Sequence, residues 1–149
     1  YMNYGSIMQK TRNRENISQE DIAKTIGISR STYGHYETQY QIIPINHLVT
    51  FCNYFNISID YIFGFTTTKN YSPTNQEINK AEIGKRLKLF RKENKLTQVK
   101  LASMLNTTQS VIADYERGRY LIATPFLYTI CKKDNLSADY LLGRIDKPL

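Results

Sequence analysis

The 149-residue chain is poor in the residues that build metal centres and covalent cross-links. It contains two cysteines, two histidines and no tryptophan. Cys52 and Cys131 are far apart, and they match neither a disulfide framework nor a zinc ligand set. The sequence also shows no catalytic Ser/His/Asp set, phosphate-binding glycine loop or cluster of metal ligands. We therefore expect a protein that is not an enzyme and that uses no cofactor or metal.

Long apolar runs are missing as well. The longest ones are interrupted by Asn, Asp, Lys or Thr well before the roughly 20 residues that span a bilayer. The N-terminus lacks the basic region and apolar core of a signal peptide. With 41% hydrophobic and 22% charged residues, the composition is that of an ordinary soluble domain. These features predict a cytoplasmic protein without a membrane partner.

Positive charge is in excess, and it is unevenly distributed. The formal net charge is +7, which favours a polyanionic partner without proving one. Residues 1–66 carry five basic and five acidic groups, and residues 67–79 carry one of each. Residues 80–149 carry fourteen basic and seven acidic groups, so the whole excess lies in the second half.

The two halves resemble one another. Shifting the chain by 79 residues aligns residues 4–65 with residues 83–144 without a gap. A gapless register over about 60 residues predicts two copies of one small domain, because this period is too long for a solenoid repeat. Identical pairs include Gly5/Gly84, Arg12/Arg91, Gln19/Gln98, Ala23/Ala102, Ser31/Ser110, Tyr36/Tyr115, Glu37/Glu116, Cys52/Cys131, Ser58/Ser137, Asp60/Asp139, Tyr61/Tyr140 and Gly64/Gly143.

A polar segment separates the copies. Residues 66–75 are rich in Thr and Asn and include Pro73, a composition typical of linkers. We therefore predict a net-neutral first domain at residues 2–66, a linker at 67–79 and a basic second domain at 80–149.

Helical periodicity dominates both copies, and no strand is required. The first helix of each copy has an apolar face, and in the second copy its outer face is rich in lysine. We expect Ser18 and Thr97 to cap second helices at 19–26 and 98–105. These helices end at Gly27 and Asn106, residue types that tolerate a left-handed conformation.

A third helix follows the second after a three-residue turn. Ser29 and Thr108 are expected to cap these third helices, which run to about residues 37 and 116. Two short helices joined by a tight turn form a helix-turn-helix unit.

Two further helices complete each copy. The fourth spans 44–55 in the first copy, and in the second it is expected to begin with Thr124 as cap and Pro125 at the first helical position. The final short helices are capped by Ser58 and Ser137 and closed by Gly64 and Gly143. The predicted fold is all-α, with two tandem five-helix helix-turn-helix domains.

The second copy resembles the Cro/C1-type phage-repressor (XRE-like) family along its whole length. The first copy is similar to the same family, but it has Gln39 where the family usually has glycine after the third helix. The resemblance implies the lambda-repressor-like fold and binding of double-stranded DNA. It is carried in the second copy by Ile83-Gly84-Lys85-Arg86-Leu87, Leu96-Thr97-Gln98, Leu101-Ala102, Tyr115-Glu116-Arg117-Gly118-Arg119 and Leu136-Ser137-Ala138-Asp139-Tyr140-Leu141-Leu142-Gly143.

The resemblance also implies which residues contact DNA. In the second copy Gln109, Ser110 and Asp114 would read base edges in the major groove, with glutamine suited to adenine and aspartate to cytosine. Thr108 would combine capping with a DNA contact.

Phosphate contacts are implied at both ends of the helix-turn-helix unit. Gln98 would contact phosphate at the start of the second helix, and Arg117 and Arg119 would do so after the third. Arginine at position 30 would suit guanine. The matching residues of the first copy are Gln19, Ser29, Arg30, Ser31 and His35.

Some of the repeated residues have structural interpretations. The resemblance implies that the Arg12–Glu37 and Arg91–Glu116 pairs link the first helix to the end of the third, with DNA contact as the alternative. Tyr36, Tyr115, Tyr61 and Tyr140 are expected in the core, and both cysteines are expected to be buried thiols.

The sequence thus predicts a transcriptional regulator, acting as a repressor, that occupies an operator. Members of the family usually dimerise to read half-sites ~34 Å apart. Two tethered domains could do this within one chain, or the chain could form a homodimer. The alternative is a protein-interaction module, antitoxin-like or an inhibitor of another regulator, in which the neutral first domain mediates dimer or partner binding.

Overall fold

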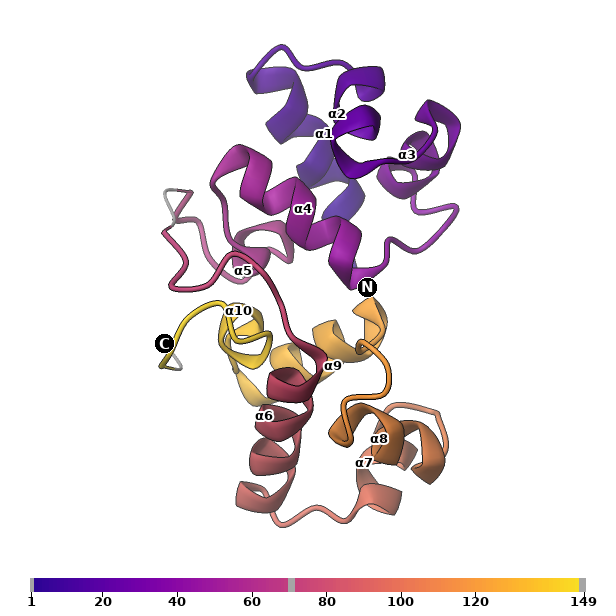
Figure 1. Cartoon of the computed structure of the whole chain (residues 1–149), viewed down its shortest axis with the longest axis vertical. Coiled ribbons are helices and arrows are strands. Elements are labelled where there is room, and N and C mark those ends of the chain that lie inside the picture. Colours follow the sequence, from indigo (N-terminus) through magenta and orange to yellow (C-terminus); the bar gives the residue numbers. More distant parts are fainter. Residues whose placement is uncertain (1, 70–71, 148–149) are drawn as a thin grey trace. The chain divides into compact units, whose positions relative to one another are not determined.

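All regular secondary structure in the described residues is helical. The computed structural model describes residues 2–69 and 72–147 (Figure 1). The chain divides into two compact units, the first ending at Ser72 and the second beginning at Pro73. The predicted all-α architecture of two tandem five-helix units is confirmed within these residues. None of the helices in the described ranges has the length and apolarity needed to cross a bilayer.

The two units repeat one order of helices. In each unit the first helix packs against the third, and the second and third helices contact each other as the helix-turn-helix unit. The first unit contains α1 (Tyr4–Arg14), α2 (Gln19–Ile26), α3 (Arg30–Glu37), α4 (Ile45–Phe55) and α5 (Ile59–Ile62). The second unit contains α6 (Lys80–Glu93), α7 (Gln98–Met104), α8 (Gln109–Glu116), α9 (Thr124–Asp134) and α10 (Ala138–Leu141).

Most helix ends follow the predicted capping chemistry. The hydroxyls of Ser18, Thr97 and Ser29 each accept a backbone N–H from the first turn of the helix that follows. Ser58 and Ser137 cap α5 and α10 in the same way. Gly27 and Asn106 adopt the predicted left-handed conformation, with φ values of 88° and 56°. Short polar side chains therefore fix where these helices begin, and the positive-φ residues fix where α2 and α7 give way to the turn.

Four details of the predicted helix ends need correction. Pro44 is the cap residue of α4, which begins at Ile45. Thr108 occupies the cap position of α8 but makes no capping bond, because its hydroxyl instead bonds the Ser110 hydroxyl at 3.1 Å. Thr124 is the first residue of α9 and is buried, and Ala123 precedes it as the cap residue. The helix α7 ends at Met104, one residue earlier than predicted.

Each unit has its own apolar core. Cys52 and Cys131 are buried free thiols, as predicted. Tyr36 and Tyr115 are buried, whereas Tyr61 and Tyr140 are only half-buried. The core therefore contains the tyrosines of the third helices more fully than those of the fifth.

A close backbone approach joins the first and third helices of each unit. A Cβ placed on Gly5 would lie 2.1 Å from the carbonyl oxygen of Glu37, and one on Gly84 would lie 2.4 Å from that of Tyr115. Real Cβ atoms do not approach backbone oxygens so closely. Glycine at this repeated position is therefore required by packing.

The units differ where the third helix ends. Gly118 has φ +75°, and a Cβ there would lie 3.0 Å from the Cα of Ala81, in the first turn of α6. The helix α1 begins one turn later than α6 in the aligned register, at Tyr4. Gln39 stands at the Gly118 position with φ +60°, accepts the N–H of Gly5 at 3.1 Å and donates to the carbonyl of Met2 at 3.0 Å. The glutamine thus caps a shortened helix where the second unit needs glycine.

We expect Gly5→Ala to lower the free energy of unfolding of the first unit by about 2 kcal/mol or more, because the methyl group would overlap the backbone of α3. Gly34→Ala is the matched control in the same unit. Its Cβ would meet only the Gln19 side chain at 3.6 Å, and alanine gains up to about 1 kcal/mol of helix propensity. Chemical denaturation followed by NMR signals of the first unit would measure both, and equal effects would contradict the packing argument.

Candidate nucleic-acid interface

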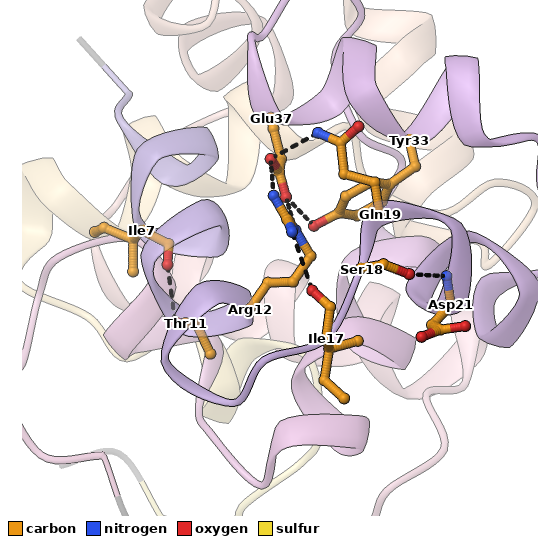
Figure 2. Close-up of polar contacts among 9 residues, drawn as sticks. All are labelled: Ile7, Thr11, Arg12, Ile17, Ser18, Gln19, Asp21, Tyr33 and Glu37. Atoms are coloured by element: carbon orange, nitrogen blue, oxygen red, sulfur yellow. Dashed lines mark hydrogen bonds and ion pairs between the residues drawn. The ribbon is translucent and has the colours of Figure 1, made fainter.

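A buried ion pair fixes the base of each helix-turn-helix unit. Arg12 Nε and Nη2 bond the two carboxylate oxygens of Glu37 at 2.8 and 3.1 Å (Figure 2). Arg91 bonds Glu116 in the same bidentate way, at 2.6 and 3.0 Å. The glutamate side chains are only 3% and 4% exposed. The ion pairs implied by the family resemblance are therefore present, and they lie inside the fold.

Each arginine also holds the segment that leads into the second helix. Nη1 of Arg12 donates to the carbonyl oxygen of Ile17 at 3.0 Å, and Nη1 of Arg91 donates to that of Leu96 at 3.0 Å. One guanidinium thus connects the first helix, the entry to the second and the end of the third. Figure 2 shows these contacts converging in the first unit. The orientation of the third helix follows from this junction.

The glutamine at the start of the second helix joins the same network. Gln19 donates to Glu37 at 3.0 Å, and Gln98 donates to Glu116 at 3.1 Å. In the second unit the Gln98 oxygen also accepts a bond from the side chain of Gln109 at 3.3 Å. A continuous path of hydrogen bonds therefore runs from the buried ion pair to an exposed side chain on α8. The family resemblance gave no sign of this path.

The first unit adds a donor that the second lacks. The Tyr33 hydroxyl donates to Glu37 at 2.6 Å, and the aligned residue of the second unit is Ile112. Burial alone would raise the pKa of Glu37, but hydrogen bonds from Arg12, Tyr33 and Gln19 outweigh it and lower the pKa. Burial and the bond to Glu37 in turn raise the pKa of Tyr33 far above its ordinary value. Glu37 is thus held as a carboxylate by its donors.

The start of the third helix is open to solvent in both units. Thr108, Gln109 and Ser110 are exposed, as are their counterparts Ser29, Arg30 and Ser31. Ser29 is engaged in capping through the N–H of Thr32, which leaves Arg30 and Ser31 as the outward side chains of that turn. The side chains predicted to read bases at this turn therefore lie on accessible surface.

At the end of α8 and just beyond it, residues that were predicted to contact DNA also contact one another. Arg117 forms an ion pair with Asp114 Oδ1, and Arg119 approaches the same oxygen at 3.9 Å. From the sequence these residues were expected to have separate roles, although an acid and a base three residues apart at a helix end commonly pair. The matching residues of the first unit are His35, Thr38 and Tyr40, where the His35 ring packs 4.9 Å from that of Tyr40. This edge is charged in one unit and aromatic in the other.

In each unit a buried ion pair holds an exposed third helix against the second helix. These features define a tandem helix-turn-helix protein. A sequence profile described as "Helix-turn-helix domain" matches residues 84–147, and one described as "Helix-turn-helix" matches residues 8–62. The chain belongs to the Cro/C1-type helix-turn-helix family, in two copies.

Similar proteins come from bacteria and a phage. The chain is 33% identical over 63 residues to the uncharacterized HTH-type transcriptional regulator YobD of Bacillus subtilis, covering 42% of the chain and 56% of YobD. It is 55% identical over 38 residues to the immunity repressor protein of Bacillus phage phi105, covering 26% of each. It is 34% identical over 67 residues to the antitoxin PezA of Streptococcus pneumoniae, covering 45% of the chain and 42% of PezA. The matches thus span about half of these relatives or less.

We predict that acid weakens the first unit through Glu37. A carboxylate with a lowered folded-state pKa contributes stability above its unfolded-state pKa, and the contribution is lost as the pH falls through the folded value. The free energy of unfolding of the first unit should therefore decrease once the pH drops below the ordinary glutamate value of 4.5. Denaturation across this range, followed by NMR signals of the first unit, measures the slope.

The variants Glu37→Gln and Glu116→Gln form a matched pair for this prediction. Glu37→Gln should remove the part of the slope that Glu37 contributes to the first unit. Glu116→Gln should leave the slope of the first unit as it is, because Glu116 lies in the other unit. An unchanged slope in Glu37→Gln would show that other groups cause the acid sensitivity.

Proposed function

We propose that the chain is a sequence-specific DNA-binding transcriptional regulator, acting as a repressor, and that α8 enters the major groove. The observation that carries the proposal is the exposed Gln109 at the start of α8, joined through Gln98 to the buried Arg91–Glu116 pair. A base-reading side chain needs a fixed position, and this network supplies one. The basic excess in residues 80–149 supplies the attraction to phosphate.

Each predicted contact of the second unit has a place in this proposal. Gln109 bonds adenine, and Ser110 and Thr108 contact the neighbouring base edge or phosphate. Gln98 and the free N–H groups at the start of α7 meet the backbone. Asp114 Oδ1 orients Arg117 and Arg119 toward phosphates, which leaves Oδ2 for a cytosine amino group.

In this proposal the first unit also contacts bases, through side chains that differ from those of α8. Arg30 would bond guanine O6 and N7, supported by Ser31, His35 and the backbone contacts of Gln19 and Ser29. The segment that joins the two units would tether the two surfaces and raise the effective concentration of the second at its half-site. The regulator would then bind a bipartite operator, as one chain or as a homodimer.

Selection of bound sequences from a random duplex pool tests the proposal. We expect the full chain to enrich a bipartite site, because its two third helices present different side chains. Parallel selections with Arg30→Ala and Gln109→Ala assign each part of the site to a unit. If the full chain enriches no sequence, the regulator proposal is wrong.

Gln109→Ala should relax the preference at one base pair by about 1–3 kcal/mol, because a bidentate contact to adenine is lost. Arg119→Ala is the matched comparison on the phosphate side. It should weaken all duplexes alike and reduce the salt slope of log K by about 1. Quantitative binding to the selected duplex and its point variants separates the two patterns, and a uniform loss in Gln109→Ala would remove its base-reading role.

Arg30→Ala tests the first unit in the same way. If Arg30 bonds guanine, this variant loses preference at one position and leaves the part of the site read by α8 unchanged. Unchanged affinity and preference would exclude base reading by Arg30.

A second function is favoured by the edge of the first unit that follows α3. Tyr40 is 79% exposed and Ile42 is 53% exposed, where the second unit has Arg119 and Leu121. Exposed apolar side chains in a stretch without lysine or arginine, residues 31–46, suit a protein partner better than phosphate. In this alternative the first unit mediates dimerisation or binds a partner, a role in keeping with the similarity to an antitoxin.

Light scattering on the full chain tests dimerisation through this edge. We expect Tyr40→Ser with Ile42→Ser to weaken self-association, and Tyr120→Ser, also an exposed tyrosine, to leave it unchanged. Equal behaviour of both variants would exclude this edge as the dimer contact.

A further inference from the structure

A shallow hollow of about 460 Å³ lies on the second unit, over α6 and the chain that follows α10. Its lining comes from the outer face of α6, from Tyr140 and from the C-terminal segment. Basic, apolar and aromatic side chains share this surface. The lining residues are Glu82, Lys85, Arg86, Lys88, Leu89, Lys92, Tyr140 and Asp146.

The charges in the hollow are not balanced internally. Arg86 is committed to the fold: it bonds Glu82 at 3.0 Å and the carbonyl oxygens of Tyr140 and Ile145 at 2.6 and 2.7 Å. Its guanidinium also lies 4.6 Å from the centre of the Tyr140 ring. Glu82 is therefore paired with Arg86. Asp146 is the other acid in the lining, and three lysines line the hollow with it.

Three lysines give the hollow its positive charge. Lys85, Lys88 and Lys92 are exposed, and no ion pair joins them to an acid within residues 2–69 and 72–147. They follow a spacing of three and four residues, which places them on one side of α6. An anionic group in the hollow would therefore meet several unpaired cations.

An apolar side chain lies among these lysines. Leu89 is 49% exposed and lines the hollow beside the half-buried Tyr140. Exposed leucine on a helix is costly to leave in water, at about 25 cal/mol for each Å² of apolar surface. A ligand that carries only charge would satisfy the lysines and leave this apolar surface uncovered.

The first unit shows that the fold does not require these side chains. The residues aligned with Lys85, Lys88 and Lys92 are Ser6, Gln9 and Asn13, and Lys10 stands at the position of Leu89. The same helix is built in both units, so the lysines and the leucine belong to the second unit alone.

Most of the hollow faces away from α8. Gly84 and Arg91, about two turns apart on α6, contact the end of α8. At about 100° per residue, Lys88 lies about 50° around α6 from that contact, Lys85 and Lys92 lie about 100° around, and Leu89 lies about 150° around. A molecule bound to α8 would therefore leave most of the hollow accessible.

We propose that the hollow is a docking site for an acidic amphipathic segment of a partner protein. Carboxylates of the partner would pair with Lys85, Lys88 and Lys92, and one apolar side chain would cover Leu89 and the edge of Tyr140. A nucleic acid is a poorer fit, because phosphates would not bury Leu89. This proposal does not depend on DNA reading by α8.

Fluorescence anisotropy of the full chain with a labelled synthetic peptide tests the proposal. The probe is a short amphipathic helix with glutamates on one face and leucines on the other. Lys85→Ser with Lys92→Asn introduces the residues of the first unit and should weaken binding about threefold to tenfold, as expected for two exposed ion pairs. Leu89→Gln should weaken it by a similar factor.

Matched controls make the outcome specific. Lys132→Asn with Lys133→Ser removes two exposed charges from α9 and should leave peptide affinity unchanged. Peptides with glutamine for glutamate, or with serine for leucine, should bind more weakly than the probe. Circular dichroism should show unchanged helix content, since all four lysines lie on the surface.

Three results would overturn the proposal. The first is no peptide binding, and the second is an equal loss in the α6 and α9 variants, which would indicate nonspecific charge attraction. The third is weaker binding of a random-sequence duplex by the α6 variant with unchanged peptide binding, which would assign the lysines to phosphate.

Discussion

The arrangement of each helix-turn-helix unit depends on one buried arginine–glutamate pair. Arg12 and Arg91 reach from the first helix to the glutamate that ends the third, and each also binds the carbonyl that precedes the second helix. Removing one member of a buried pair typically costs about 3–5 kcal/mol, because the other charge is left without a partner. The contact is possible because glycine lets the first helix approach the backbone of the third. Ion pair and glycine therefore act together to set the angle at which the third helix is presented.

The two units keep this junction and change what surrounds it. In the first unit Tyr33 adds a third type of donor to Glu37, and Gln39 caps a shortened α1. In the second unit α6 is one turn longer, and Gly118 leaves room for that turn. Gln39 thus has a structural explanation as a compensating cap, and its presence does not by itself indicate a lost DNA surface. The surface differences lie farther out, where Arg117 and Arg119 are replaced by Thr38 and Tyr40.

In the second unit the junction extends to the surface. Gln98 shares its amide between Glu116 and Gln109, so the exposed Gln109 is restrained by a buried carboxylate. Arg30 occupies the Gln109 position in the first unit, and no such link from it to Gln19 is seen in the described residues. The two third helices therefore differ both in the side chain they offer and in how firmly it is held. Preorganisation of this kind reduces the entropy lost on binding.

The sequence by itself determined the repeat, the helix order and most helix ends. These properties depend on local chemistry: apolar periodicity, the hydroxyls of Ser18, Ser29 and Thr97, and residues that tolerate positive φ at positions 27 and 106. Through the family resemblance it also predicted the Arg–Glu pairs. Local rules failed at Thr108, where a neighbouring hydroxyl competed for the capping side chain, and at Thr124, which burial placed inside the helix. Only the tertiary structure decided the Gln98–Gln109 link, the Asp114 cluster, the role of Gln39 and the hollow beside α6. Most of these join residues far apart in the chain, and even the short-range Asp114 cluster depends on side-chain positions that packing and competing partners set.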